Sequence, residues 1–238
     1  MASGETNLYQ DRLESRSPGF GADISSQRAD DLDLAACAYL MDAKAAGQSV
    51  LALDVGCGIG GQAFRMARAG AGRVIGLDIA AIPAEFYREA ADRAGAVLSD
   101  VLFCRQDMTA LPFVGEMDLA GQVGVLVCQR AIHYLPHKRA RMLLEAFFTT
   151  LEPGGRLYLS ASGMASELVS GYEDAGLDVA ARFCRLGLGM RQKHKIESPV
   201  CLYWREELAW IVESAGIRVL GLTNSPFGNV KLIGEKPA

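Results

Sequence analysis

The sequence of 238 residues has only six cysteines, and no two of them are spaced as CxxC or combined with histidine in a zinc-binding pattern. This scarcity excludes a disulfide-rich scaffold, and no group of residues suggests a metal site. We expect the cysteines to be buried free thiols of a protein in a reducing compartment. They are Cys37, Cys57, Cys104, Cys128, Cys184 and Cys201.

Long apolar runs and an excess of positive charge are also missing. No stretch reaches the ~20 apolar residues that span a bilayer, and the first residues, Met1 to Asn7, lack the basic start and apolar run of a signal peptide. With 24 basic and 28 acidic residues the net charge is −4, which excludes a protein built for bulk nucleic-acid binding. Half of the residues are apolar and 22% are charged, so we expect a globular, soluble, cytoplasmic protein without membrane contact.

The first part of the chain differs from the rest. Residues 1–26 are polar, without a sustained period, and are interpreted as an arm. From Gln27 to Ala46 the period is helical, and Leu34, Ala38 and Met41 share one face. We therefore divide the chain into an N-terminal arm with a lid helix, residues 1–46, and a main domain, residues 47–238.

Strands and helices alternate through the main domain. The helices are expected at 62–69, 84–94, 137–151 and 206–215, and the strands at 50–55, 74–77, 101–104, 123–128, 156–160, 218–223 and 230–234. Short continuous apolar runs such as Val50–Val55 are typical of strands that are buried on both faces. The pattern predicts an α/β fold with a doubly wound, mostly parallel sheet, helices on both faces and a C-terminal antiparallel hairpin.

A glycine-rich turn follows the first strand. Gly56, Gly58 and Gly61 even satisfy the GxGxxG spacing of dinucleotide-binding proteins, and such a turn lets a ligand approach the backbone and a helix N-terminus. However, Asp54 stands just before the glycines, where its carboxylate would repel a pyrophosphate but would suit an ammonium group.

Two more acids follow the next two strands. Asp78 ends the second strand, where a carboxylate can accept both hydroxyls of a ribose, and Asp107 follows the third, where it can accept from an exocyclic amine. Each acid alone could be a solvated strand end or a helix cap. Together, at the carboxyl ends of successive strands, they indicate a nucleoside site.

The segment Leu51–Asp78, with Asp107-Met108 and Leu151–Arg156, resembles class I S-adenosylmethionine-dependent methyltransferases. The resemblance covers about residues 50–160 and extends less strictly to the C-terminal hairpin. It implies a seven-stranded sheet with a reversed last strand, and S-adenosyl-L-methionine as the cofactor. It also implies these roles: Asp54 and the turn Gly56-Cys57-Gly58 at the methionine end, Asp78 on the ribose, Ile79 against the adenine, Asp107 and Met108 at the adenine amine and ring, and Gln129 at the methionyl part.

The loop after the fourth strand carries His133 and Tyr134, which we expect near the transferred methyl group. His133 is the candidate catalytic base, with Tyr134 beside it. The alternative is that both residues only pack this loop against the next helix.

Two windows of the sequence contain basic residues and no acid, and they include all three histidines. The first basic window lies between Asp118 and Glu145, and the second between Asp178 and Glu197. The second belongs to residues 162–199, an insertion that we expect to cover the methyl acceptor. If the windows converge, the acceptor is anionic; otherwise they are ordinary solvated faces.

The leading hypothesis is therefore a methyltransferase that acts on a small molecule by direct displacement. The first alternative has RNA or a nucleotide as the acceptor, and the second is a non-catalytic regulatory protein that binds S-adenosylmethionine. A nicotinamide-dependent reductase is the least supported, because Asp54 would repel the pyrophosphate of its cofactor. The sequence does not indicate the identity of the acceptor, the attacking atom or the oligomeric state.

Overall fold

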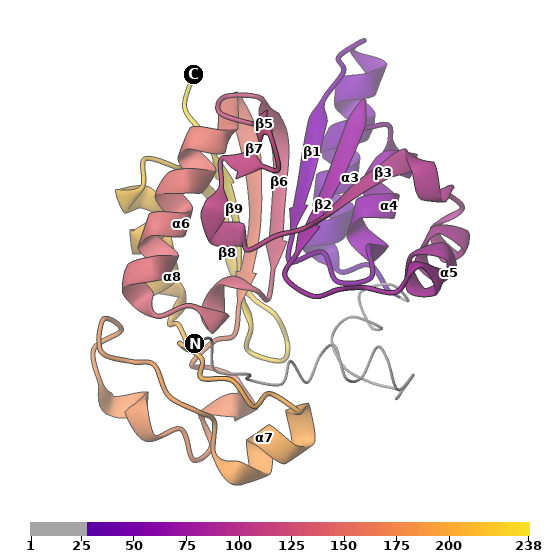
Figure 1. Ribbon diagram of the computed structural model, residues 1–238. Helices are drawn as coiled ribbons and strands as arrows, with labels where there is room; N and C mark the ends of the chain where they lie inside the picture. The colour runs from indigo at the N-terminus through magenta and orange to yellow at the C-terminus, as the bar shows by residue number, and fades with distance from the viewer. Residues whose placement is uncertain (1–27) are drawn as a thin grey trace.

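Seven strands form the central sheet in the order β3-β2-β1-β6-β7-β9-β8, in a computed structural model that describes residues 28–238 (Figure 1). Their bounds are β1 Leu51–Val55, β2 Arg73–Asp78, β3 Val101–Arg105, β6 Val123–Gln129, β7 Leu151–Ala161, β8 Arg218–Asn224 and β9 Val230–Glu235. Strands β3, β2, β1, β6 and β7 are parallel, and β9 runs antiparallel to both β7 and β8. The predicted seven-stranded sheet with its C-terminal hairpin is confirmed.

The central strands are apolar along their whole length because both faces of the sheet are covered. In β6, Val125 and Val127 join the core on one face, whereas Leu126 and Cys128 join the core on the other. All four side chains are fully buried. A strand in this position cannot show the alternation of polar and apolar residues that marks a half-exposed strand.

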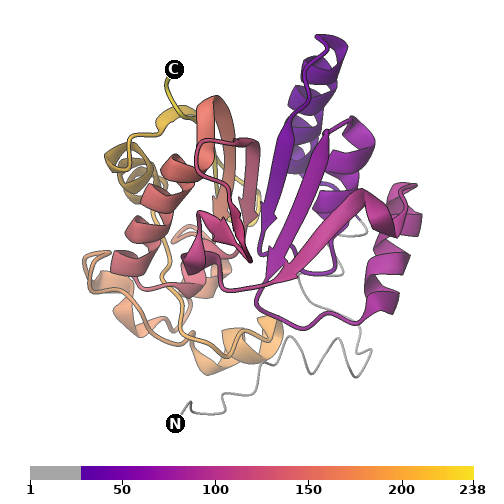
Figure 2. The same cartoon turned by 45° about the horizontal axis from the view of Figure 1, so that its top comes forward.

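Helices lie on both faces of the sheet, as Figures 1 and 2 show. One face carries α3 (Asp31–Ala45), α4 (Gly61–Ala69) and α5 (Ala84–Ala94), and the other carries α6 (His137–Thr150) and α8 (Arg205–Ser214). The doubly wound arrangement is thus confirmed. Because parallel strands end at the same edge, the loops after β1, β2, β3 and β6 all lie at the carboxyl edge of the sheet.

The apolar face by which the sequence marks α3 is not the face that the helix buries. Leu34 and Met41 are 60% and 54% exposed, and Ala38 is exposed as well. The buried side of the helix is formed instead by Leu32, Asp33, Ala36, Leu40 and Ala43. The reason is a tertiary contact. Asp33 accepts hydrogen bonds from Arg65 of α4 and from Gln129 of β6, and these bonds turn its side of the helix toward the core.

Short elements connect the main ones. The hairpin of β4 (Phe113–Val114) and β5 (Met117–Asp118), which the sequence pattern did not predict, and the 3-10 turns η1 (Leu98–Asp100), η2 (Met108–Ala110) and η3 (Ile132–Tyr134) are all of this kind. Between β7 and α8 the chain forms η4 (Glu167–Val169), η5 (Glu173–Gly176) and α7 (Leu188–His194). We call residues 162–199 the insertion.

The insertion lies beyond the carboxyl edge of the sheet, at the bottom of Figures 1 and 2. It has a small apolar cluster that it shares with the segment just after it: Met164, Leu168, Tyr172, Leu186, Val200 and Leu202. Arg182 joins the insertion to α8: it is 3% exposed, its guanidinium is 2.8 Å from a carboxylate oxygen of Glu207, and it also donates to the Leu202 carbonyl.

All six cysteines are free, as predicted, but their burial differs. Cys57, Cys128 and Cys201 are buried, whereas the other three are half-buried. The predicted arm, residues 1–26, lies outside the described residues. Of the helices in residues 28–238, none is both long and apolar enough to cross a bilayer.

Candidate functional site

The glycine turn between β1 and α4 is held tightly against β2. The N–H groups of Gly56 and Cys57 both donate to the Leu77 carbonyl, at 2.7 and 3.1 Å. Gly56 has a φ of 72°, and a Cβ added there would lie 2.8 Å from the Cβ of Ala131. A side chain at Gly56 is therefore excluded both by conformation and by space. Cys57 is buried, and its thiol donates to the Gly58 carbonyl at 3.6 Å.

The N-terminus of α4 begins at this turn without a side-chain cap. The residue before the helix, Gly60, has a φ of 86° and no side chain to accept from the first helical N–H groups. Uncapped N–H groups at a helix N-terminus attract the negatively charged or carbonyl groups of a ligand.

Asp78 links the turn to the end of β2. One of its carboxylate oxygens accepts from the Gly58 N–H at 2.9 Å, and the other accepts from the Ala80 N–H at 2.8 Å. Burial raises the pKa of this carboxyl. Each oxygen still has acceptor capacity, so the carboxylate can receive two neighbouring hydroxyls. Ile79 follows it and is 63% exposed, which leaves an apolar surface open for a flat ring.

Asp54 is in β1, just before the glycine turn, and is only 4% exposed. One of its carboxylate oxygens has no hydrogen-bond partner among the described residues. Burial, followed by the negative charges of Asp33 and Asp78, raises the pKa of Asp54 to about 7, although Arg65 opposes the shift. A buried carboxyl with an unpaired oxygen suits a positively charged ligand group.

Two further predicted residues follow β3, the strand beside β2. Asp107 is exposed, and one of its oxygens accepts from both the N–H and the hydroxyl of Thr109 at 2.8 Å. Met108 after it is half-buried. The turn, Asp78, Ile79 and this pair therefore follow three neighbouring strands at one edge of the sheet.

Gln129, at the end of β6, is already engaged within the protein. Its amide group donates to carboxylate oxygens of Asp33 and Asp30, and its own oxygen lies 3.4 Å from the Ser160 hydroxyl. Its predicted contact with the methionyl part of a cofactor stays a prediction, and its visible role is to join β6 and β7 to α3.

Asp33 is the residue that the sequence analysis missed. It is 3% exposed, accepts from Gln129, and forms an ion pair with Arg65 of α4 at 3.2 Å. It also completes a capping box with Asp30 at the start of α3. The sequence offered only a cluster of acids in a first helical turn, which the helix dipole explains without a further role.

His133 is buried and faces inward. It is 2% exposed, its Nδ1 accepts from the Ser162 N–H at 3.4 Å, and its carbonyl accepts from the Cys201 N–H at 2.8 Å. Burial, with the charge of Arg130, lowers the pKa of His133 to about 3. Its predicted role as a base stays a prediction, and this environment favours the alternative in which it fixes the loop. Tyr134, whose ring centroid is 4.4 Å away, is 41% exposed.

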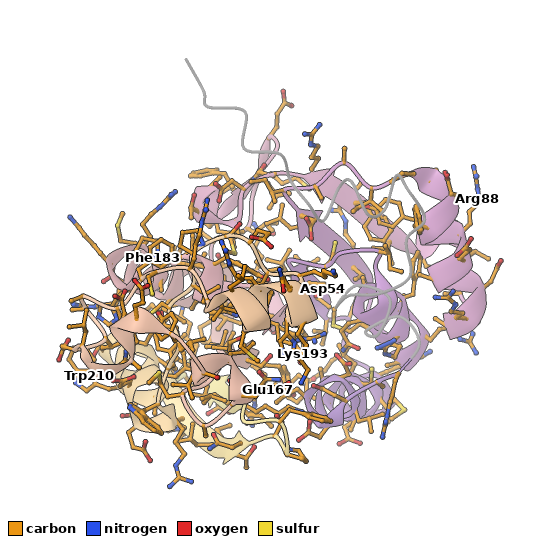
Figure 3. All side chains as sticks on the ribbon, turned by 90° about the horizontal axis from the view of Figure 1, so that it is seen from below. Asp54, Arg88, Glu167, Phe183, Lys193 and Trp210 are labelled. Carbon is orange, nitrogen blue, oxygen red and sulfur yellow. The ribbon has the colours of Figure 1, made fainter. Side chains whose placement is uncertain are left out.

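The second basic window is largely neutralised by carboxylates. Arg182 pairs with Glu207, Arg191 with Glu197, and both Lys193 and His194 with Glu167. Figure 3 labels Glu167 and Lys193 close together on the insertion, and Asp54 nearer the middle of the molecule. Among the described residues, Arg185 and Lys195 are the two cations of this window without an ion pair.

Residues 28–238 contain no group of three His, Cys, Asp or Glu side chains that could bind a metal ion. The site offers backbone N–H groups, carboxylates and an exposed apolar side chain. This donor set fits a nucleoside that carries an ammonium group.

A family model described as "Methyltransferase domain" matches residues 52–155 of the chain. That range contains every predicted cofactor-binding and catalytic residue. A search of curated proteins gives no match.

Solved structures share the fold over most of the chain. A 1,6-didemethyltoxoflavin-N1-methyltransferase of Burkholderia thailandensis, bound to that compound and S-adenosylhomocysteine, is 16% identical with a TM-score of 0.61, covering 97% of this chain and 88% of its own. The magnesium protoporphyrin IX methyltransferase of Synechocystis, bound to S-adenosylhomocysteine, is 16% identical with a TM-score of 0.59, covering 96% and 98%. The [4+2]-cyclase SpnF, 15% identical with a TM-score of 0.59, covers 87% and 81%.

At these identities the structural matches establish the fold alone. The cyclase illustrates this limit, because its fold is similar and its named reaction is different. The reaction class is therefore indicated by the domain match together with the site.

Proposed function

Because the chain is a class I S-adenosylmethionine-dependent methyltransferase, we propose that it transfers the methyl group to a small molecule bound between the carboxyl edge of the sheet and the insertion. S-adenosylmethionine supplies a methyl group on a positively charged sulfur, which a nucleophile displaces directly. The protein must hold the two reactants in line and keep water out.

The observation that carries the proposal is how firmly the insertion and the segment just after it are bonded to the loop after β6 and to each other. The Cys201 N–H donates to the His133 carbonyl, the Ser162 N–H to His133 Nδ1, and the Met164 N–H to the Tyr203 carbonyl. Such a fixed cover favours a small acceptor, because a polymer needs an open surface.

In this proposal the cofactor is bound by the glycine turn and by residues at the ends of β1, β2 and β3. Asp78 receives the ribose hydroxyls, Ile79 packs on the adenine, and Asp107 receives the adenine amine. Asp54, with its unpaired oxygen, receives the ammonium group at the methionine end. Gly56 keeps the turn in its conformation, because a Cβ at this position would collide with the Cβ of Ala131.

His133 and Tyr134 divide their roles in this account. With Nδ1 accepting a hydrogen bond, a neutral His133 carries its proton on Nε2, so it is a donor and holds the loop in place. Tyr134 is the exposed member and is the residue that contacts the acceptor. An acceptor whose nucleophile is already unprotonated needs no base from the protein.

The ion pairs of the second basic window bear on the charge of the acceptor. Carboxylates contact four of the six basic side chains in the second basic window, which weakens the support that this window gives to a strongly anionic acceptor or to RNA. Arg185 and Lys195 remain exposed for one negatively charged group.

The test uses a cell extract separated by size into small molecules, RNA and protein. Each fraction is incubated with S-adenosylmethionine that carries a labelled methyl group, with wild-type protein and with Asp78→Ala. The proposal expects label in the small-molecule fraction with the wild type and none with Asp78→Ala. Label that enters only the RNA or protein fraction would contradict it.

A further inference from the structure

The negative charge at the methionine end of the site comes from two chain segments. Asp54 belongs to β1, whereas Asp33 is brought by α3, which precedes the sheet in sequence. Both carboxyls are nearly inaccessible, with exposures of 4% and 3%, and the charge of Asp33 acts on Asp54 more strongly than that of any other side chain. Asp54 is paired in register with Val127 of β6, and Gln129, two residues further along β6, donates to the Asp33 carboxylate. Two negative charges that are buried on such neighbouring segments oppose each other's ionisation.

The two carboxyls differ in how they are satisfied. Asp33 accepts from the Gln129 amide, from Arg65 and from the Asp30 N–H. Asp54, in contrast, keeps one oxygen without a partner among the described residues. A buried oxygen without a partner costs free energy unless a ligand group or a proton occupies it.

Helix α3 is fastened at the end that carries Asp33. Lys231 of β9 forms ion pairs with Asp30, at 2.9 Å, and with Asp31. Gln62 of α4 donates to the Asp33 carbonyl at 3.3 Å. These contacts hold the Asp33 carboxyl at a fixed place, next to the end of β6.

We propose that Asp33 is the electrostatic partner of Asp54 and that together they make the methionine end selective for an ammonium group. This inference rests on the proposed assignment of Asp54 to the cofactor's ammonium group. Asp33 acts through Asp54 and is therefore a positioning residue.

Several charged or titratable groups surround the pair. Arg65 on α4 is the opposing positive charge, and Asp78 on β2 adds a further negative one. Cys57 and Cys128 lie close enough to Asp54 for its charge to raise the pKa of both thiols, after burial has done so, which keeps them protonated. Asp54 is therefore the group that a bound cation can ionise near neutral pH.

The test compares two ligands that share the adenosine half. S-adenosylhomocysteine carries the amino-acid end with its ammonium group, whereas 5′-methylthioadenosine lacks it. Calorimetric titrations use the full chain as wild type, Asp33→Asn and Asp54→Asn. The control, Asp42→Asn, removes a negative charge from an exposed position of the same helix.

In Asp33→Asn we expect S-adenosylhomocysteine to bind about tenfold more weakly, as one lost charge at short range implies, and 5′-methylthioadenosine to bind within about twofold of the wild type. Asp42→Asn should leave both affinities within about twofold. Equal weakening of both ligands in Asp33→Asn would mean that Asp33 only supports the fold of α3, and this result overturns the proposal. Unchanged affinity for S-adenosylhomocysteine overturns it as well.

Proton release gives a second, independent measure. At pH 6.5 an α-amino group is already protonated, so protons released on binding come from the protein. Because Asp54, with its raised pKa, is largely protonated at this pH when the site is empty, titrations in phosphate and in imidazole buffer should show release of more than half a proton in the wild type. The release should be clearly smaller in Asp33→Asn and Asp54→Asn. Equal release in all three proteins contradicts the proposal. If Asp54→Asn binds S-adenosylhomocysteine as the wild type does, the assignment of Asp54 has failed, which is a separate outcome.

Discussion

Replacing Asp54 by asparagine should make the ligand-free protein more stable at neutral and alkaline pH, although it removes a residue of the site. Asp54 is buried with one unpaired oxygen, and its pKa is raised from 3.8 to about 7 by burial and then by Asp33. Asparagine has nearly the same shape and no charge, so it avoids the cost of ionising a buried carboxyl.

The sign and the magnitude follow from proton linkage. The folded-state pKa lies above the unfolded-state pKa, so between about pH 4 and pH 7 the unfolded chain loses its proton first and wild-type stability falls as the pH rises. Relative to a carboxyl that stays protonated, these two pKa values lower the free energy of unfolding by about 2 kcal/mol at pH 5 and about 4 kcal/mol at pH 8. The advantage of Asp54→Asn should therefore grow by about 2–3 kcal/mol between pH 5 and pH 8.

Urea unfolding followed by circular dichroism at pH 5 and pH 8 measures this difference. All other titrating groups are common to both proteins, so their contributions cancel in the comparison. Asp42→Asn, an exposed position on α3, is the matched control and should show no pH-dependent change. An advantage that is the same at both pH values, or a loss of stability at pH 8, would refute the reasoning about Asp54.

Three other substitutions test other parts of the structure. Asp78→Ala should weaken binding of S-adenosylhomocysteine at least about a hundredfold by calorimetry, because two hydroxyls and the turn's own N–H lose their acceptor; a loss below fivefold would contradict the assignment. Gly60→Ala should lower the free energy of unfolding by about 1–3 kcal/mol in urea titrations, since φ is 86° and the new Cβ would lie 2.6 Å from the Phe103 ring; unchanged stability would show that the turn is not constrained. Arg182→Met should cost about 2–4 kcal/mol by leaving Glu207 without its partner, and limited proteolysis should cut the insertion first; cleavage elsewhere at the wild-type rate would oppose this anchoring role.

Much of the fold could be predicted because the sheet interior imposes a simple pattern. Apolar runs such as 123–128 mark strands that are buried on both faces, and glycines such as Gly56 mark a turn that no other residue fits. The three acids Asp54, Asp78 and Asp107 could be found for the same reason, because each follows a recognisable strand. Local pattern and ligand chemistry coincide at these positions.

The features that could not be predicted depend on contacts between distant segments. The chain 31–45 carries two apolar stripes of the same spacing, and the choice between them depends on Asp33 meeting Gln129 and Arg65, which lie far away in sequence. The pairing of the second basic window is of the same kind. Its lack of acids suggested free positive charge, whereas Glu167 and Glu207, outside the window, neutralise it.

The most direct test of the account is titration of the purified full chain with S-adenosylhomocysteine and, in parallel, with NAD. The glycine spacing alone fits both ligands, and Asp54 is what distinguishes them, because its buried carboxyl favours an ammonium group and repels a pyrophosphate. We predict micromolar or tighter binding of S-adenosylhomocysteine and no measurable binding of NAD. Binding of NAD alone would contradict the reading of Asp54 and every assignment that rests on it.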